Sequence, residues 1–391
     1  MLFSWVPVWG KTAPPPSDRS NLTAIENPGA LANFFKALSE AKSGRRIEPV
    51  RLMHFGDSHV AADVLTAEIR QRLQSQFGDG GAGYIVPRNP MSTRRRGVLS
   101  GATQGWQIEG IGGRLESDGI YGPAGISLMT SAPNERIWLE ASCNHFEVYY
   151  VSQPGGGKID IEIDGASVLD EPLSLNSHRI ATESITFDNP ADTVHRLEIR
   201  TLLPGKTRIL GIAAERIAPG ISYDVLGING ARASRLLSWN TAALAANLAQ
   251  RKPELIVLAY GTNEVADPSW TPASYRRLLK VVIHELRAAA PQASILLFAP
   301  PDRTDLPLAA QRMPAMIETE RRAAIESNAA FWSAYDAMGG PGSMNAWVGR
   351  GLGQGDQVHL TRPGYAMLAD AFFRDLMRAY NQSKTRSRNQ Q

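Results

Sequence analysis

A serine near the start of the chain and an aspartate–histidine pair near its end have the residue types of a nucleophile with its base. Ser58 follows Gly56 and Asp57, while Asp356 and His359 are separated by two residues. A serine hydroxyl becomes a nucleophile at neutral pH only beside a base, and that base needs an acceptor to orient it. The pattern therefore predicts Ser58 as a nucleophile, His359 as its base and Asp356 as the orienting acceptor.

Two further segments could stabilise the negative charge that acyl transfer places on the substrate oxygen. They are Gly230, which follows Asn229, and Asn263, which follows Gly261 and Thr262. Such a charge needs hydrogen-bond donors that are fixed before the reaction. The backbone amides of Ser58 and Gly230 and the side-chain amide of Asn263 would make a hole with three donors. Glycine at position 230 lets the backbone approach closely.

Each of these groups follows a predicted β-strand. The strands expected before Ser58, Gly230 and Asn263 span residues 51–56, 223–228 and 255–260. In α/β proteins, ligands bind outside the carboxyl ends of the parallel strands. The three groups are therefore expected to meet at one edge of a sheet.

Alternating strands and helices indicate the fold class. Two more strands are predicted over 294–298 and 331–336, and helices over 30–41, 62–77, 236–249, 274–289, 313–328 and 364–380. This alternation is typical of an α/β fold with a doubly wound, mostly parallel sheet.

The stretch between Gly78 and about Gly220 lacks helical periodicity. Short apolar or alternating runs predict strands there, with a hairpin turn over 153–157, and together they indicate an inserted β-sandwich-like domain. We expect both of its ends to lie beside the catalytic edge. The insert would then either hold a polymer near the site or act as a brace that covers one edge of the sheet.

The resulting division of the chain has five parts. They are an irregular lead-in over 1–28, a first α/β part over 29–99, the β-rich insert over 100–220, a second α/β part over 221–381 and a basic polar tail over 382–391.

Composition sets limits on the class of protein. The chain has 391 residues, of which 43% are hydrophobic and 20% charged, with a formal net charge of +3 and a single cysteine, Cys143. The basic clusters 94–96 and 384–388 lack the interleaved aromatics of a nucleic-acid platform, so we interpret them as solvated loops and expect no nucleic-acid partner. No apolar run is long enough for a transmembrane helix, and no complete signal peptide is present.

Four segments together resemble the SGNH (GDSL-like) hydrolase family. They are Gly56–His59, Asn229–Gly230, Gly261–Glu264 and Asp356–His359, and they follow the order of four of the family's conserved blocks. The resemblance implies an SGNH/flavodoxin-like fold and the same roles for the triad and the oxyanion donors. The longer string over 56–63, Gly-Asp-Ser-His-x-x-Ala-Asp, resembles the bacterial peptidoglycan O-acetylesterase branch, which carries a β-rich insert similar in architecture to a carbohydrate-binding module.

Five more residues are candidates for lining the pocket, and each has an ordinary alternative. Asp57 and Glu264 flank predicted site residues, and His59 either lines the pocket or caps a helix. Trp270 and Trp347 lie in segments near the site and could stack on a sugar, although most tryptophans are expected in cores.

The resulting hypothesis is a serine esterase that removes O-acetyl groups from a carbohydrate polymer, with O-acetylated peptidoglycan as the leading substrate. An exopolysaccharide or plant-polysaccharide esterase, an acetyltransferase, and a polysaccharide-binding or assembly protein on the same fold remain alternatives. No cofactor or metal is expected, and the oligomeric state is left open. The suspected substrate suggests a periplasmic or other extracytoplasmic location.

Overall fold

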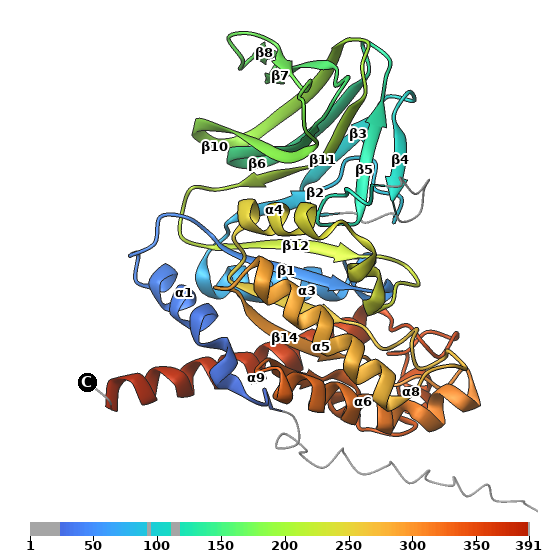
Figure 1. The fold of residues 1–391 in the computed structure, drawn as a ribbon. Helices are drawn as coiled ribbons and strands as arrows, with labels where there is room; N and C mark the ends of the chain where they lie inside the picture. The colour runs from blue at the N-terminus through green and yellow to red at the C-terminus, as the bar shows by residue number, and fades with distance from the viewer. Residues whose placement is uncertain (1–23, 92–94, 111–117, 390–391) are drawn as a thin grey trace, which may run out of the picture.

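A computed structural model describes residues 24–91, 95–110 and 118–389, so most of the expected lead-in and the last two residues lie outside the described residues. Two layers of structure are evident: an α/β part and, above it, a second β-sheet (Figure 1). Within the described ranges, no helix is both long and apolar enough to span a membrane.

The α/β part is built on a parallel sheet whose described strands number five, in the order β12-β1-β13-β14-β15. These strands are β1 (Val50–Gly56), β12 (Ile221–Gly227), β13 (Leu255–Ala259), β14 (Ser294–Ala299) and β15 (Ala330–Ser333). Apart from the insert, the second strand in the chain lies outside the first, which is the flavodoxin-like order. The predicted doubly wound fold is confirmed.

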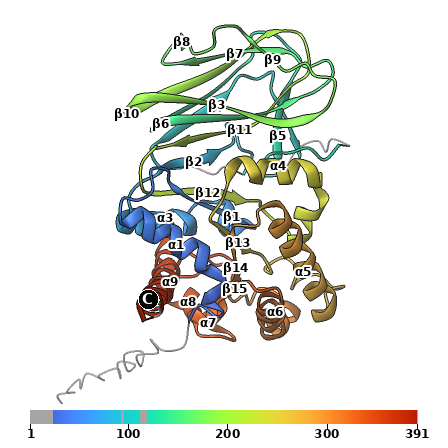
Figure 2. The ribbon, with the colours of Figure 1, turned by 60° about the vertical axis from the view of Figure 1, so that its left-hand side comes forward.

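Helices cover both faces of this sheet (Figure 2). One face carries α4 (Thr241–Arg251), α5 (Pro272–Ala289) and α6 (Pro307–Glu326). The other carries α1 (Ala32–Lys42), α3 (Leu65–Phe77), α7 (Ala334–Met338), α8 (Ser343–Gly349) and α9 (Arg362–Asn389). Short 3-10 helices span Pro28–Leu31 and Ala233–Ser238. Leucines, isoleucines and phenylalanines at helical spacing make the inward stripes, as expected for amphipathic helices.

Several elements differ from the sequence prediction. The helix expected over 62–77 begins later, at Leu65, as α3, and a separate short helix, α2 (Ser58–Ala61), precedes it. Asp63 between the two helices has a left-handed backbone with φ of 50°. The helix expected to end at residue 380 continues to Asn389, into the segment predicted as a tail.

The inserted segment forms one antiparallel sheet that contains ten strands within the described residues. They are β2 (Gly81–Ile85), β3 (Val98–Ala102), β4 (Gln107–Gly110), β5 (Ile126–Thr130), β6 (Arg136–Ser152), β7 (Lys158–Ile163), β8 (Ala166–Ser167), β9 (Leu173–Ser174), β10 (Ala181–Leu203) and β11 (Thr207–Glu215). The inserted antiparallel sheet domain is confirmed, and its sheet takes in β2, which begins before residue 100.

Strand pairing in the insert differs from the prediction. Residues 137–139 and 146–151, which read in the sequence as two separate short runs, belong to the single strand β6. Its long pairing with β10 includes a register shift between Asp188 and Thr193. The hairpin predicted at 153–157 is wrong, because β10 lies between β6 and β7. The turn is present, but the strands on its two sides pair with β10 instead of with each other.

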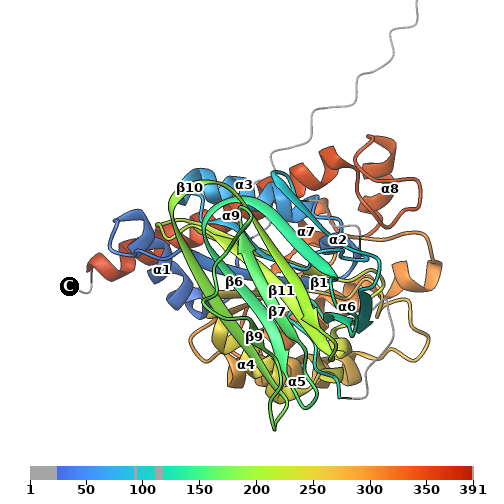
Figure 3. The same cartoon turned by 90° about the horizontal axis from the view of Figure 1, so that it is seen from above.

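The insert enters and leaves at the amino ends of the parallel strands. Gly80 donates a backbone hydrogen bond to Ile221 at the start of β12, Arg216 donates one to Gly80, and Val50 at the start of β1 donates one to Gly220. The expectation that both ends lie beside the catalytic edge is therefore wrong. The loop after β2 contacts that edge through Met91, which bonds Asn229. The long strands of the insert lie across the α/β part (Figure 3).

Buried ion pairs join the insert to the α/β part. Arg251, at the end of α4, bonds Glu215 of β11 at 2.6 Å and Asp224 of β12 at 2.7 Å, and all three side chains are buried. Arg51 of β1 also contacts Glu215, at 2.8 Å. Removing one partner of such a buried pair leaves an uncompensated charge, so the contact strongly ties the two sheets together.

Candidate active site

Ser58, His359 and Asp356 lie in one hydrogen-bonded line. The Ser58 Oγ is 2.7 Å from the His359 Nε2, and the His359 Nδ1 is 2.7 Å from the Asp356 Oδ2. In this arrangement one imidazole nitrogen faces the hydroxyl and the other faces the carboxylate. The imidazole can then take the hydroxyl proton while the carboxylate stabilises the resulting charge.

A tight turn at the end of β1 positions Ser58. Asp57 caps helix α2, and its Oδ1 accepts a hydrogen bond from the His59 amide at 3.0 Å. The turn also needs a glycine in the neighbouring strand, because a Cβ on Gly227 would lie 2.2 Å from the Ala61 nitrogen. This close approach brings Ser58 to the carboxyl edge of the sheet.

The loop before α9 holds the other two members of the line. The Asp356 Oδ1 accepts hydrogen bonds from the amides of Val358 and His359, both at 3.0 Å. Burial alone would raise the pKa of Asp356, but the bonds from the His359 side chain and from these two amides lower that pKa to about 2. Asp356 therefore stays ionised at neutral pH and can orient His359.

The predicted oxyanion donors lie at the ends of the adjacent strands. Gly230 follows β12 with φ of 71°, a left-handed conformation that favours glycine. The Asn263 Nδ2 donates to the Ala231 carbonyl at 2.9 Å, which fixes the amide and leaves its second N–H available. The amides of Ser58 and Gly230 make no hydrogen bond within the part of the chain that the structure describes. These three groups can receive a developing oxyanion.

We expect Asn263→Ala to lower the turnover number about 10²–10³-fold, since an oxyanion donor acts chiefly in the transition state. Turnover and KM on an aryl acetate measure this effect. Asn240→Ala is the control, because Asn240 caps α4 and should change stability without changing turnover. An unchanged turnover number for Asn263→Ala would mean that Asn263 is only structural, through its bond with Ala231, and is not an oxyanion donor.

Glu264 ties the two oxyanion segments together. Its Oε1 accepts a hydrogen bond from the Ala233 amide at 2.7 Å, and its Oε2 accepts one from the Gly261 amide at 3.0 Å. Burial raises the pKa of Glu264 to about 7. Only 5% of the surface of Glu264 is exposed, so this residue offers little surface to a substrate. It supports the site by holding the two segments in place.

Asp57 is buried beneath the same site. Burial raises its pKa to about 6, although the hydrogen bond from His59 lowers that pKa in part. The folded protein therefore holds the Asp57 proton more tightly than the unfolded chain does. The contribution of the protonated Asp57 carboxyl to the stability of the fold is complete below about pH 4 and is lost as the pH rises through about 6.

Wild type should therefore lose stability as the pH rises from 4 to 7, and Asp57→Asn should not lose it. The melting temperature of Asp57→Asn minus that of wild type should rise over this range. Asparagine keeps an acceptor for the His59 amide and does not titrate. Thermal unfolding at several pH values measures the difference. Asp170→Asn, at an exposed position of the insert, is the control and should show no such trend. A constant difference for Asp57→Asn would contradict the raised pKa.

His59 lies against the catalytic histidine candidate. Its ring centroid is 5.2 Å from that of His359, and its Nδ1 is 2.8 Å from the Tyr365 hydroxyl. Burial, followed by the nearby His359, lowers the pKa of His59 to about 3, so this imidazole is neutral. It neither caps α2 with its side chain nor lies open to solvent, and we assign it to packing behind His359.

The two tryptophan candidates have different surroundings. Trp347 is 4% exposed and its Nε1 donates to the Met338 carbonyl, so the prediction that it could stack on a sugar is wrong because its ring belongs to the core. Trp270 is half-buried, with the Arg312 guanidinium 5.8 Å from its ring centroid. A role for Trp270 in sugar contact stays a prediction.

Sequence reasoning missed Met91. Its Sδ accepts a hydrogen bond from the Asn229 amide at 3.3 Å, which places the loop after β2 beside Gly230. No motif marks this methionine, because the contact joins residues 138 positions apart. Across the described ranges, no three acidic, histidine or cysteine side chains gather closely enough to hold a metal ion.

Comparison with known families identifies the α/β part. Residues 203–367 match the profile of the GDSL-like lipase/acylhydrolase family. Over this stretch the chain is similar to a GDSL-like hydrolase domain. The matched stretch includes Gly230, Asn263, Asp356 and His359, while Ser58 precedes it because the insert separates β1 from the rest of the hydrolase domain.

One solved structure is similar to most of the chain, including the insert. A structure of a peptidoglycan O-acetylesterase matches with a TM-score of 0.77 and 26% identity, covering 92% of this chain and 99% of that chain. A family two carbohydrate esterase from Cellvibrio japonicus matches with a TM-score of 0.31 and 13% identity, covering 73% of this chain and 98% of that chain. This second score is too low to carry an argument. Curated proteins give no significant match.

Proposed function

We propose that the protein is a serine esterase that removes O-acetyl groups from a carbohydrate polymer, and that this polymer is O-acetylated peptidoglycan. The observation that carries the proposal is the line from the Ser58 Oγ through His359 to Asp356, with both hydrogen bonds at 2.7 Å. The full-length likeness to a peptidoglycan O-acetylesterase supports the choice of substrate. An extracytoplasmic location follows from that substrate.

The reaction has two halves. In the first, His359 Nε2 accepts the proton of Ser58 Oγ as this oxygen attacks the acetyl carbonyl carbon. The bond from that carbon to the sugar oxygen then breaks, and the sugar oxygen takes the proton from His359. The amides of Ser58 and Gly230 and the side chain of Asn263 would stabilise the oxyanion.

In the second half, a water molecule gives its proton to His359 and attacks the acetyl group on Ser58. Acetate leaves and Ser58 Oγ regains its proton, so the protein is restored. The line of three side chains needs no cofactor for either half.

Acetate release from purified polymers tests the proposal. We expect the fastest release from O-acetylated peptidoglycan, slower release from acetylated xylan and bacterial exopolysaccharide, and none from any polymer with Ser58→Ala. Faster release from a neutral polysaccharide would reassign the substrate. Transfer of acetyl to an added sugar, without free acetate, would make the protein a transferase.

A further inference from the structure

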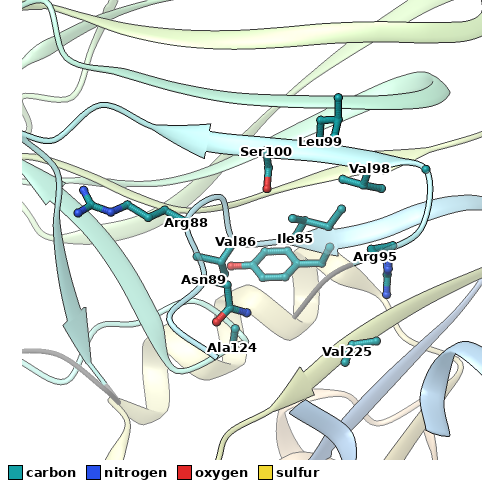
Figure 4. A pocket seen from close by; sticks show the side chains of 12 residues that line it. Ile85, Val86, Arg88, Asn89, Arg95, Val98, Leu99, Ser100, Ala124 and Val225 are labelled. Carbon is teal, nitrogen blue, oxygen red and sulfur yellow. The ribbon is translucent and has the colours of Figure 1, made fainter. Parts of the chain in front are cut away.

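A cleft of about 660 Å³ lies between the two sheets, and Ser58 is not among its lining residues. Val98 and Ser100 of β3 form one wall, Ile85 and Val86 lie behind, and Val225 of β12 closes the other side (Figure 4). The cleft thus separates the insert from the outer strand of the hydrolase sheet. Neither the triad nor the oxyanion donors account for it.

The charged groups of this cleft are all positive. Arg88 and Arg95 line it, on opposite sides of the view in Figure 4, and among the described lining residues none is acidic. Arg88 is exposed, and its Nη1 donates to the carbonyls of Thr103 and Trp106. Arg88 therefore keeps further N–H donors for a ligand.

Arg95 is buried, contrary to the prediction of a solvated basic loop. Its side chain is 7% exposed, and its Nη2 donates to the Tyr223 carbonyl at 2.6 Å. Its Nη1 is buried without a hydrogen-bond partner among the described residues. An unmet donor on a buried cation is costly, so the site favours a group that would accept this bond.

The nearest carboxylate to Arg95 is already engaged. Asp63 receives two bonds from Arg70, at 2.9 and 3.0 Å, and one from the Thr66 hydroxyl, while the Arg95 Nε stays 3.9 Å away. One carboxylate therefore serves two guanidinium groups. Burial and the neighbouring Arg70 lower the pKa of Arg95 to about 10, although Asp63 and Asp224 raise it in part.

The cleft adjoins the catalytic edge. Asn89 lines it, and the Asn89 Oδ1 accepts a hydrogen bond from the Met91 amide at 2.9 Å. The Met91 Sδ in turn accepts a bond from the amide of Asn229, the neighbour of Gly230. On the other side, Asp63 follows Ser58 by five residues. These contacts place the cleft beside the segments that carry Ser58 and Gly230.

We propose that this cleft is a subsite for a carboxylate of the acetylated polymer, with Arg95 as its main ligand and Arg88 as a second. The proposal rests on the proposed function and deepens it. Peptidoglycan carries carboxylates on its stem peptides and on those lactyl ethers that bear no peptide, whereas acetylated xylan and mannan backbones carry none. Arginine suits this task because its planar guanidinium offers paired donors to a carboxylate.

The decisive experiment uses one polymer in two forms: O-acetylated peptidoglycan before and after its carboxylates are converted to amides. For wild type, we expect amidation to raise KM about tenfold, the factor typical of a lost charge-assisted hydrogen bond. Arg95→Gln should raise KM about tenfold on the acidic polymer and have no further effect on the amidated one. The small ester 4-nitrophenyl acetate has no carboxylate, so Arg95→Gln and wild type should hydrolyse it at the same rate.

Two more variants keep the test sharp. Arg96→Gln is the matched control, because Arg96 is adjacent in the chain, exposed and absent from the cleft lining, and it should leave KM unchanged. Arg88→Gln removes an exposed side chain and should raise KM several-fold on the acidic polymer alone, so it carries the test if Arg95→Gln does not fold.

The outcomes separate the two proposals. Equal KM values for the acidic and amidated polymers, or an equal effect of the Arg95 and Arg88 variants on both, would overturn the subsite and leave the esterase proposal in place. No acetate release by wild type from either polymer, beside normal hydrolysis of 4-nitrophenyl acetate, would overturn the proposed function and the subsite with it.

Discussion

Ser58→Ala should abolish esterase activity while leaving the fold intact. Removing a member of such a triad typically costs about 10⁴–10⁶ in turnover. The Ser58 hydroxyl contacts only the His359 Nε2 among the described side chains, so its loss removes no structural bond besides that one. Initial rates on an aryl acetate, with a melting curve for each protein, measure both parts of the expectation.

A serine-directed phosphonate supplies an independent readout. It should label Ser58 alone in wild type and nothing in Ser58→Ala. Ser274→Ala is the matched control, because Ser274 also lies in the first turn of a helix but is exposed and bonded to Thr271, and it should keep full activity and labelling. Labelling at another serine, or an active Ser58→Ala protein, would refute the serine mechanism.

The second large effect is expected at Asp356. Asp356→Asn should lower turnover by about 10⁴, because an amide facing the His359 Nδ1 favours the tautomer whose Nε2 carries a proton and cannot accept one from Ser58. His359→Ala should cost more, since it removes the base itself. Turnover measured for both variants on one aryl acetate gives this ranking.

Asp305→Asn is the control for that substitution, because Asp305 pairs with Arg303 instead of with His359. It should leave turnover within a few-fold of wild type. If Asp356→Asn retained full turnover, the carboxylate would have no part in orienting His359, despite the 2.7 Å bond.

The parallel sheet and the site were open to prediction from the sequence because their signals are local. Ser58, Gly230 and Asn263 each follow a strand that forms an apolar run, and parallel strands bring their carboxyl ends to one edge. The fold then gathers these groups although they lie far apart in the chain. The structure joins Ser58, His359 and Asp356 by hydrogen bonds, and the roles that the resemblance to the SGNH family implied for these groups stay predictions.

The insert was harder to predict because its order depends on distant pairing. A run such as residues 146–151 reads as a short strand, but its length and partners are set by the pairing of β6 with β10. The turn at 153–157 indicates a hairpin locally, yet β10, which begins only at Ala181, lies between its two sides. The residues of a turn do not show that a third strand lies between the two strands that flank the turn.

The burial of individual side chains also could not be predicted from the sequence. Arg95 stands in a basic run that is typical of a solvated loop, but its contacts with Tyr223 and Asp63 come from other elements. Trp347 looks accessible in a loop-like segment and is instead enclosed by the core. Such contacts depend on tertiary packing, which neither composition nor spacing encodes.

The bond between Ser58 and His359 joins residues 301 positions apart, and this separation has a consequence for synthesis of the chain. At 5–20 residues per second, the ribosome adds His359 about 15–60 s after Ser58. Throughout that interval the nascent chain contains the serine without its base. With the proposed roles of these two residues, we expect no esterase activity until His359 has been added and the chain has folded.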